Sequence, residues 1–255
     1  MSEYLLASQQ SERDRLRVQS EVWEPAGRAL LARLGPGEGR RALDVGCGAL
    51  GWLRVLVEAG WETVGADYDA GMLEAARTLG LPVELVEDDL FASRLPADAF
   101  DLVHARFELC PLGRWDEQLA VYRRWLRPGG VLVLEDPDSR SWGYSPPAPA
   151  ADRLIELIRR AFAAAGSDFD AGRALPALLR GIGVEPDVDA HVVALPPGHP
   201  YLRSPLQFAG SLRPRLVEFL PEPELDELLA DVERELADPE RWGLPFTLVQ
   251  AWGRV

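Results

Sequence analysis

The sequence contains no lysine, and each of its 27 basic residues is an arginine. The lack of a side-chain primary amine excludes a Schiff base with a carbonyl substrate or pyridoxal phosphate, the phosphate-binding lysine of a Walker motif and a lysine general base. Asparagine is absent as well. A GC-rich genome is the simplest cause of both absences, and the exclusions hold whatever the cause.

Cysteine is scarce, and long apolar runs are missing. The two cysteines, Cys47 and Cys110, give neither a disulfide framework nor the ligand set of a zinc site. No apolar run approaches the roughly 18 residues of a membrane-spanning helix, and the first residues lack the apolar core of a signal peptide. We therefore expect a cytoplasmic protein.

Positive charge is outnumbered by negative charge, which leaves a formal net charge of -14. A protein that binds phosphates needs a basic face, so this charge argues against a nucleic-acid partner. It argues equally against docking on an anionic membrane. The length of 255 residues and the hydrophobic fraction of 47% suffice for the core of one large domain.

Strand-like and helix-like segments alternate along the first half of the chain. Residues 1–35 have apolar positions at helical spacing, with an expected break near Pro25. The alternation that follows predicts βαβ units, a parallel sheet and a ligand crevice at the carboxyl ends of its strands. The expected strands cover residues 41–46, 62–67, 82–87, 99–105 and 131–136, and the expected helices residues 50–60, 70–80 and 114–130.

The rhythm changes after residue 136, where a loop rich in proline and serine begins. Helices, one strand and further loops follow, and the chain closes on a strand-like segment. Here the expected helices cover residues 151–165, 173–182, 206–219 and 222–237, and the expected strands residues 184–195 and 245–255.

The stretch "RRALDVGCGALGW", residues 40–52, holds three glycines spaced G-x-G-x-x-G: Gly46, Gly48 and Gly51. Glycine lets the backbone approach a ligand where a Cβ would collide, and the following helix N-terminus offers N–H groups. About 20 residues later the second strand ends in Asp67, whose carboxylate can accept hydrogen bonds from both hydroxyls of a ribose. The pattern predicts a nucleotide-like ligand, the alternative being a tight turn without one.

Asp44, two residues before the first glycine, is unusual for a NAD site. In this setting "LDVGCG" resembles motif I of the class I S-adenosylmethionine-dependent methyltransferases. "VGADYDAGML" resembles their second motif, "VELVEDDLFASRLPADAFDLVHARFEL" their third and fourth, and "WLRPGGVLVLED" the turn into their fifth strand. The resemblance covers residues 41–136. One departure is Leu50, where these enzymes usually have the third glycine of G-x-G-x-G.

The resemblance implies S-adenosylmethionine as cofactor and S-adenosylhomocysteine as product. It implies that Asp67 of the second motif binds the ribose and that the loop of the first motif also contacts the cofactor. The implied loop residues are Asp44, Gly46, Cys47 and Gly48.

The resemblance also implies an adenine site. Tyr68 and Met72 would lie near the adenine, Asp89 would meet its amino group, and the Leu90 backbone would meet the ring. Asp88 could replace Asp89, because "EDD" allows a slip of one residue.

The segments that flank this region resemble one small-molecule branch of this family, the ubiquinone- and menaquinone-methyltransferase-like enzymes. "YLLASQQSERDRLRVQ" looks like a segment that folds over the cofactor. Tyr4 and Arg15 would then reach its methionine carboxylate or adenine, unless both are surface positions on an amphipathic helix. "GSDFDAGRALPALLRGIGV" and "QAWGRV" are similar to the same branch.

Methyl transfer from a sulfonium requires that the acceptor be held close and in line and that water be excluded, and a general base helps some acceptors. His104, at the end of the fourth strand, is the candidate base, unless it is a hydrogen-bonded residue of the sheet. His199 and Glu108 are further candidates, and His191 falls within a strand. Arg106 would touch the cofactor or an acidic group of the substrate.

Four tryptophans fall in or near the segments assigned to the crevice and lid. They would suit a flat apolar acceptor, and core packing is the alternative for each. They are Trp23, Trp52, Trp142 and Trp242.

We therefore expect an α/β protein: a Rossmann-like, seven-stranded, mostly parallel sheet with helices on both faces and an added helical lid. A cap (residues 1–39), a core (40–195 and 244–255) and a lid (196–243) would form one domain. The expected reaction is methyl transfer to a small molecule at O, N or C, for instance an aromatic compound or natural product. The alternatives are a NAD(P)-dependent oxidoreductase and a catalytically inactive S-adenosylmethionine-binding protein, and the assembly is open between monomer and homodimer.

Overall fold

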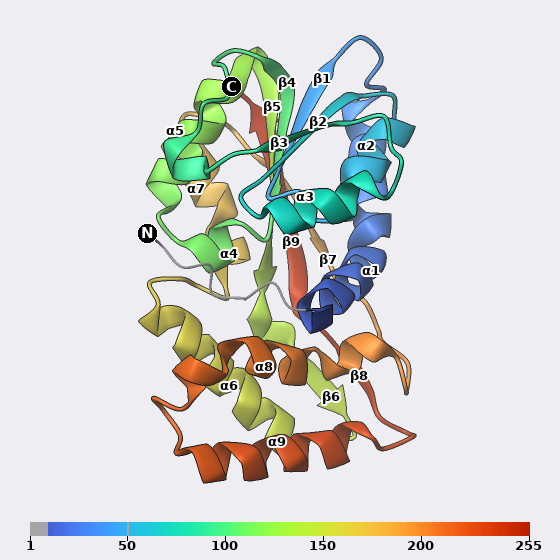
Figure 1. The fold of residues 1–255 in the computed structure, drawn as a ribbon, viewed down its shortest axis with the longest axis vertical. Helices are drawn as coiled ribbons and strands as arrows, with labels where there is room; N and C mark the ends of the chain where they lie inside the picture. Colours follow the sequence, from blue (N-terminus) through green and yellow to red (C-terminus); the bar gives the residue numbers. More distant parts are fainter. Residues whose placement is uncertain (1–9, 50) are drawn as a thin grey trace.

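The computed structural model describes residues 10–49 and 51–255, with side chains from residue 15 onward. Within this part of the chain, seven strands form one sheet in the order β3-β2-β1-β4-β5-β9-β7 (Figure 1). The strands of this sheet are β1 (Arg41–Val45), β2 (Glu62–Asp67), β3 (Glu84–Glu87), β4 (Phe100–Arg106), β5 (Leu126–Asp138), β7 (Asp187–His191) and β9 (Thr247–Arg254).

The sheet is mostly parallel, as predicted. β1 pairs in parallel with β2 and with β4, and β4 pairs in parallel with β5. β9 is antiparallel to both of its neighbours, β5 and β7. Because the order reverses at β1, the carboxyl ends of β1 and β4 open the crevice expected at such a switch point.

Helices cover both faces of the sheet (Figure 1). On one face, Leu30 and Leu31 of α1 and Val55 and Leu56 of α2 share a buried cluster with Val133 and other strand residues. In the view of Figure 1, α1 and α2 lie to the right of the sheet and α5 and α7 to the left. These helices are α1 (Gln10–Leu34), α2 (Leu53–Glu58), α3 (Ala70–Arg77), α5 (Trp115–Trp125) and α7 (Leu175–Gly181).

A further group of helices lies beyond the carboxyl ends of the parallel strands, at the bottom of Figure 1. In it α6 (Pro149–Ala164) packs against α8 (Ser204–Leu216) and α9 (Glu222–Leu236). Glu235 of α9 joins them, since its carboxylate accepts hydrogen bonds of 3.1 Å from the first turn of α6. The boundary between core and lid stays a prediction, because α6 belongs to the expected core in sequence but packs with the expected lid.

The structure differs from the sequence-based expectations at four points. α1 runs through Pro25 without the expected break. Pro25 is exposed and costs one helical hydrogen bond, while buried Trp23 and Ala26 on either side pack into the same core, which offsets the loss. α5 ends at Trp125 rather than at the Pro–Gly–Gly turn, because β5 already begins at Leu126. α4 (Leu109–Leu112) and a short ribbon of β6 (Gly143–Ser145) and β8 (Trp242–Leu244) were not expected.

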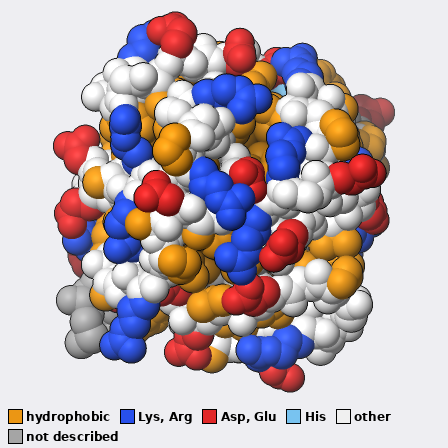
Figure 2. Space-filling model, turned by 90° about the horizontal axis from the view of Figure 1, so that it is seen from above, with side chains coloured by type: hydrophobic (Ala, Val, Ile, Leu, Met, Phe, Trp, Pro, Cys, Tyr) orange, Lys and Arg blue, Asp and Glu red, His pale blue; other side chains and the backbone are white. Residues whose placement is uncertain are grey.

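The charged surface is mixed. Figure 2, which looks at the amino ends of the parallel strands, shows arginine and acidic side chains interspersed. Arg41 contacts Glu84 at 2.6 Å, and Arg127 contacts Asp101 at 2.7 Å. None of the described helices combines the length and the apolar character that crossing a membrane requires.

Candidate functional site

A cavity of about 650 Å³ opens at the carboxyl ends of β1, β2 and β4. A volume of this size suits a nucleotide-sized ligand together with a small second molecule. His104 and all the predicted cofactor-binding residues that the structure describes line it, whereas Tyr4 and Leu50 lie outside the described residues. The lining set comprises Arg15, Asp44, Gly46, Cys47, Gly48, Asp67, Tyr68, Met72, Asp88, Asp89, Leu90, His104 and Arg106. Their contacts with a ligand stay predictions.

The glycine loop is held in place by β2. The Cys47 N–H donates to the Ala66 carbonyl at 3.0 Å, and the Gly48 N–H donates to the Asp67 carboxylate at 2.8 Å. Gly46 and Gly48 have φ of 58° and 56°, a region that favours glycine. A Cβ on Gly48 would meet nothing within 4 Å, so the cavity is open directly over the loop. The Cys47 side chain is buried, and burial together with Asp44 raises the pKa of its thiol.

Asp67 ends β2 with its carboxylate in the cavity. One oxygen accepts from Gly48, and the other accepts from the Asp69 N–H at 2.8 Å. Burial raises the pKa of Asp67, although these two N–H groups lower it in part. The carboxylate therefore links the glycine loop to the start of α3, at the position where the sequence predicts a ribose.

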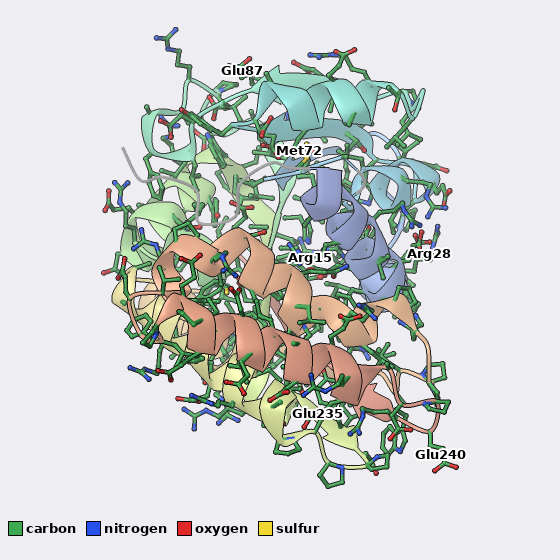
Figure 3. All side chains as sticks on the ribbon, turned by 60° about the horizontal axis from the view of Figure 1, so that its bottom comes forward. Arg15, Arg28, Met72, Glu87, Glu235 and Glu240 are labelled. Carbon is green, nitrogen blue, oxygen red and sulfur yellow. The ribbon has the colours of Figure 1, made fainter. Side chains whose placement is uncertain are left out.

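The predicted adenine residues lie along one wall of the cavity. Asp69 caps α3 by accepting from the Gly71 N–H at 2.7 Å, which fixes the helix that carries buried Met72 (Figure 3). Tyr68 is 71% exposed at the cavity edge. Asp89 accepts from Phe91 N–H at 3.0 Å, and Asp88 from Arg94 N–H at 3.1 Å, so the geometry gives neither carboxylate precedence.

A row of buried polar side chains crosses the sheet beside the loop. Asp44 on β1 contacts the Nδ1 of His104 on β4 at 2.6 Å and accepts from the Trp52 N–H at 3.3 Å. The Nε2 of His104 lies 3.8 Å from the Glu135 carboxylate on β5. Glu135 in turn accepts from the Gln250 amide of β9 at 2.9 Å.

His104 is enclosed by the side chains around it. The Trp52 ring stacks on its imidazole with the ring centres 3.8 Å apart, and the residue is 1% exposed. Burial opposes the charged imidazole, but Asp44 and Glu135 outweigh it and raise the pKa of His104. Because both ring nitrogens face carboxylates, the geometry favours the structural alternative for His104 over a general base that reaches an acceptor.

The other histidines lie away from the row's centre. His191 contacts the Gln250 amide oxygen at 2.8 Å, as a strand residue. The Nδ1 of His199 accepts from Tyr201 N–H at 3.2 Å, and burial lowers the pKa of His199. Neither lines the cavity.

Arg15 of α1 lines the cavity beside α8. Its side chain is 2% exposed, donates to Gln19 at 2.5 Å and lies over the Phe208 ring of α8, 4.4 Å from the ring centre (Figure 3). Arg106 is half-buried at the end of β4, with its guanidinium 5.8 Å from the centre of the Phe107 ring. Both cations therefore border the cavity, and the contact of Arg15 with a cofactor stays a prediction.

The inner half of the cavity is lined by phenylalanines that the sequence did not single out. Phe162 and Phe169 stack with ring centres 4.7 Å apart, and Phe169 meets Phe208 edge to face at 5.3 Å. Phe246 packs edge to face on Phe107 at 5.6 Å. They come from four separate segments, so no spacing in the sequence marks them as one group.

The four tryptophans do not gather around the cavity. Trp23 and Trp142 are buried in packing around Phe246, with ring centres 5.4 and 5.9 Å from it. Trp242 is 42% exposed on β8. Of the four, only Trp52 lines the cavity, and its ring stacks on the imidazole of His104.

Gly46→Ala is expected to weaken S-adenosylhomocysteine binding and to lower the free energy of unfolding by about 1–3 kcal/mol, because alanine is strained at φ of 58°. A Cβ there would also lie 1.9 Å from the Glu108 carboxylate. Calorimetry and urea unfolding measure the two effects. Gly181→Ala is the matched control, because a Cβ there meets no described atom within 4 Å. Unchanged affinity in Gly46→Ala would contradict the assignment of this loop.

Comparisons with known proteins agree with this geometry. The profile of the family described as "Methyltransferase domain" matches residues 19–231. A malonyl-[acyl-carrier protein] O-methyltransferase of Enterobacter lignolyticus is 31% identical over 143 residues, which are 53% of this chain and 57% of the relative. A trans-aconitate 2-methyltransferase of Azoarcus sp. is 36% identical over 137 residues, 51% of this chain and 53% of the relative. The chain thus spans about half the length of these relatives.

Solved structures share the fold. A putative methyltransferase from Bacillus halodurans has a TM-score of 0.58 at 16% identity, over 90% of this chain and 98% of that chain. The [4+2]-cyclase SpnF has a TM-score of 0.53 at 23% identity, over 89% of this chain and 80% of that chain. The family match covers most of the chain, and the predicted motifs meet in one cavity. The protein belongs to the class I S-adenosylmethionine-dependent methyltransferases.

Proposed function

We propose that this protein transfers a methyl group from S-adenosylmethionine to a small-molecule acceptor. The observation that carries the proposal is the cavity itself: a glycine loop tied to Asp67 at one end opens into a phenylalanine-lined space at the other. The first part suits a nucleoside with a ribose, and the second suits an apolar molecule beside it.

The reaction asks for positioning more than for chemical assistance. S-adenosylmethionine supplies, when bound, a methyl group on a positively charged sulfur. The chain would hold the ribose through Asp67, the adenine between Met72 and the loop that carries Asp88 and Asp89, and the methionine end near Arg15. The phenylalanines would orient the acceptor in line and exclude water, which is where most of the rate enhancement of such a displacement arises.

Two other functions predict different behaviour. A NAD(P)-dependent oxidoreductase would use the same glycine loop, but the family match and the cavity beyond the loop give it no support. A protein that binds the cofactor without catalysis would keep the same cavity. SpnF, named as a cyclase, has this fold, and a fold alone does not establish methyl transfer.

The remaining parts of the proposal concern context. Residues 196–243 would act as a lid over the acceptor, and the segment before residue 40 as a cap over the cofactor. We place the reaction in the cytoplasm, with support from two free, buried thiols, which are typical of a reducing compartment. Nucleic acids and membranes are not expected as partners, and the protein would act as a monomer or a homodimer.

The test is methyl transfer from S-[methyl-³H]adenosylmethionine to a panel of small amines, phenols and carboxylic acids. Acceptor-dependent label in at least one product, formed together with S-adenosylhomocysteine, is the expected result. Binding of S-adenosylhomocysteine without transfer to any compound of the panel would favour the inactive binder.

A further inference from the structure

The carboxylate of Glu108 points into the cavity between the glycine loop and the phenylalanines. It lies so close to the loop that a Cβ on Gly46 would sit 1.9 Å from its Oε1. Glu108 is at the N-cap position of α4, yet its side chain makes no capping hydrogen bond. Among the described residues, none donates a hydrogen bond to this carboxylate. A half-buried carboxyl group that borders the cavity and accepts no hydrogen bond from the described residues is available to a ligand.

The backbone turns this side chain inward at a strained residue. Phe107 has φ of 61°, which is rare for an aromatic residue, and its N–H donates to the Glu135 carbonyl at 2.8 Å. The strain is held by the surrounding structure, as at many functional sites. It places the Phe107 ring on Phe246 and the Glu108 carboxyl at the junction between the loop and the inner half of the cavity.

The ionisable groups around Glu108 are mainly carboxyl groups. Burial, followed by Asp67, Asp136 and Asp44, raises the pKa of Glu108 well above its ordinary value. Asp136 on β5 is itself buried, and burial raises its pKa to about 8. The buried Tyr122 hydroxyl of α5 donates to the Gln118 side chain at 2.6 Å and so does not neutralise the Glu108 carboxylate. A bound cation would favour the ionised form of these carboxyl groups, so the site suits a ligand that carries or develops positive charge and opposes an alkoxide or phenolate.

The cavity is also lined by cations, among them Arg15, Arg106 and Arg114. Arg15 is stacked on Phe208, and Arg106 faces Phe107 and Glu135. An acceptor carboxylate would be drawn to Arg15, so an acid is the competing ligand class. The aromatic faces of the inner cavity complement an ammonium through cation–π attraction.

We propose that Glu108 binds the nucleophilic nitrogen of the acceptor and takes a proton from it, and that the acceptor is an amine on an apolar or aromatic skeleton. The inference rests on the proposed methyl transfer. The carboxylate accepts one proton from the bound ammonium and leaves a nitrogen lone pair. The N–C bond then forms as the C–S bond breaks with its electron pair going to sulfur, so the positive charge passes from the sulfonium to the methylated amine.

The binding experiment uses three probes with one skeleton: 3-phenylpropylamine, 3-phenylpropan-1-ol and 3-phenylpropanoic acid. Each is titrated calorimetrically into the protein saturated with S-adenosylhomocysteine. The amine should bind about tenfold tighter than the other two, and Glu108→Gln should abolish this preference. Equal binding of all three, or tighter binding of the alcohol or the acid, overturns the amine assignment.

Turnover of the amine tests the proton transfer. Glu108→Gln should lower kcat/KM by about 10²–10⁴-fold. In the wild-type protein the rate should rise as the pH passes through the raised pKa of Glu108, because the carboxylate form is the base. The variant should lack this rise. Glu240→Gln, the same change at an exposed residue far from the cavity, is the control (Figure 3). An unchanged pH profile in Glu108→Gln overturns the role as base.

S-adenosylhomocysteine binding separates the two levels of the proposal. If the wild-type protein does not bind it, the proposed methyl transfer fails and the amine question with it. If Glu108→Gln loses S-adenosylhomocysteine affinity by the same factor as it loses amine turnover, Glu108 belongs to the cofactor site and the inference is wrong. Unchanged cofactor affinity with lost amine preference supports it.

Discussion

Replacing Asp67 by alanine is expected to weaken S-adenosylhomocysteine binding by about a hundredfold or more. A hydrogen bond to a charged group contributes about 1.5–3 kcal/mol, and Asp67 would accept two from the ribose. The same change frees the Gly48 N–H, which now donates to this carboxylate at 2.8 Å, so the loop also loses its anchor on β2. Calorimetric titration of the purified variant measures the loss.

The matched control is Asp187→Ala. Asp187 is exposed on the edge strand β7, far from the cavity lining. It should bind S-adenosylhomocysteine like the wild type. If Asp67→Ala retains wild-type affinity while remaining folded, the ribose is held elsewhere and the assignment of the second motif is wrong.

Replacing His104 by leucine is expected to lower the free energy of unfolding by about 3–5 kcal/mol. The change leaves Asp44 and Glu135 as buried carboxylates without the group between them, and breaking a buried charged pair has costs of this size. Glu135 is 0% exposed, so water cannot replace the lost partner. Urea unfolding gives the magnitude, and His199→Leu, in a surface loop, should cost much less.

The free energy of unfolding should also depend on pH in a way that distinguishes His104→Leu from the wild-type protein. The pKa of His104 is raised in the folded protein, so its contribution is fully present below the unfolded pKa of about 6.5. That contribution is lost as the pH rises through the raised pKa of the folded state. The pKa of Glu135 is lowered, so its contribution is lost as the pH falls through that lowered value. His104→Leu should lack the loss on the alkaline side, and an identical decline in both proteins would contradict the buried pair.

Short-range features of the cofactor half could be predicted from the sequence. β1, the glycine loop and β2 are consecutive, so the spacing of Gly46, Gly48 and Asp67 fixes their meeting at one sheet edge. The mostly parallel sheet follows from the same alternation of strands and helices. The three-residue strands of the ribbon are too short for any periodicity, and the continuity of α1 through Pro25 depends on tertiary packing.

The acceptor half could not be predicted in the same way. Phe162 and Phe169 are close in the sequence, but Phe208 and Phe246 lie far from them, and the rings meet only through the tertiary packing that sets α8 against α6. The environment of His104 depends on the register of separate strands, which no local pattern specifies. Its position at the end of β4 was predicted, and its enclosure by two carboxylates and the Trp52 ring was not.

The central claim is that the glycine loop and Asp67 bind an S-adenosyl ligand rather than a dinucleotide. Calorimetric titration of the wild-type protein with S-adenosylhomocysteine and, separately, with NADH tests it most directly. The account predicts micromolar binding of S-adenosylhomocysteine and none of NADH. Binding of NADH without S-adenosylhomocysteine would contradict it, because the same loop would then hold a pyrophosphate.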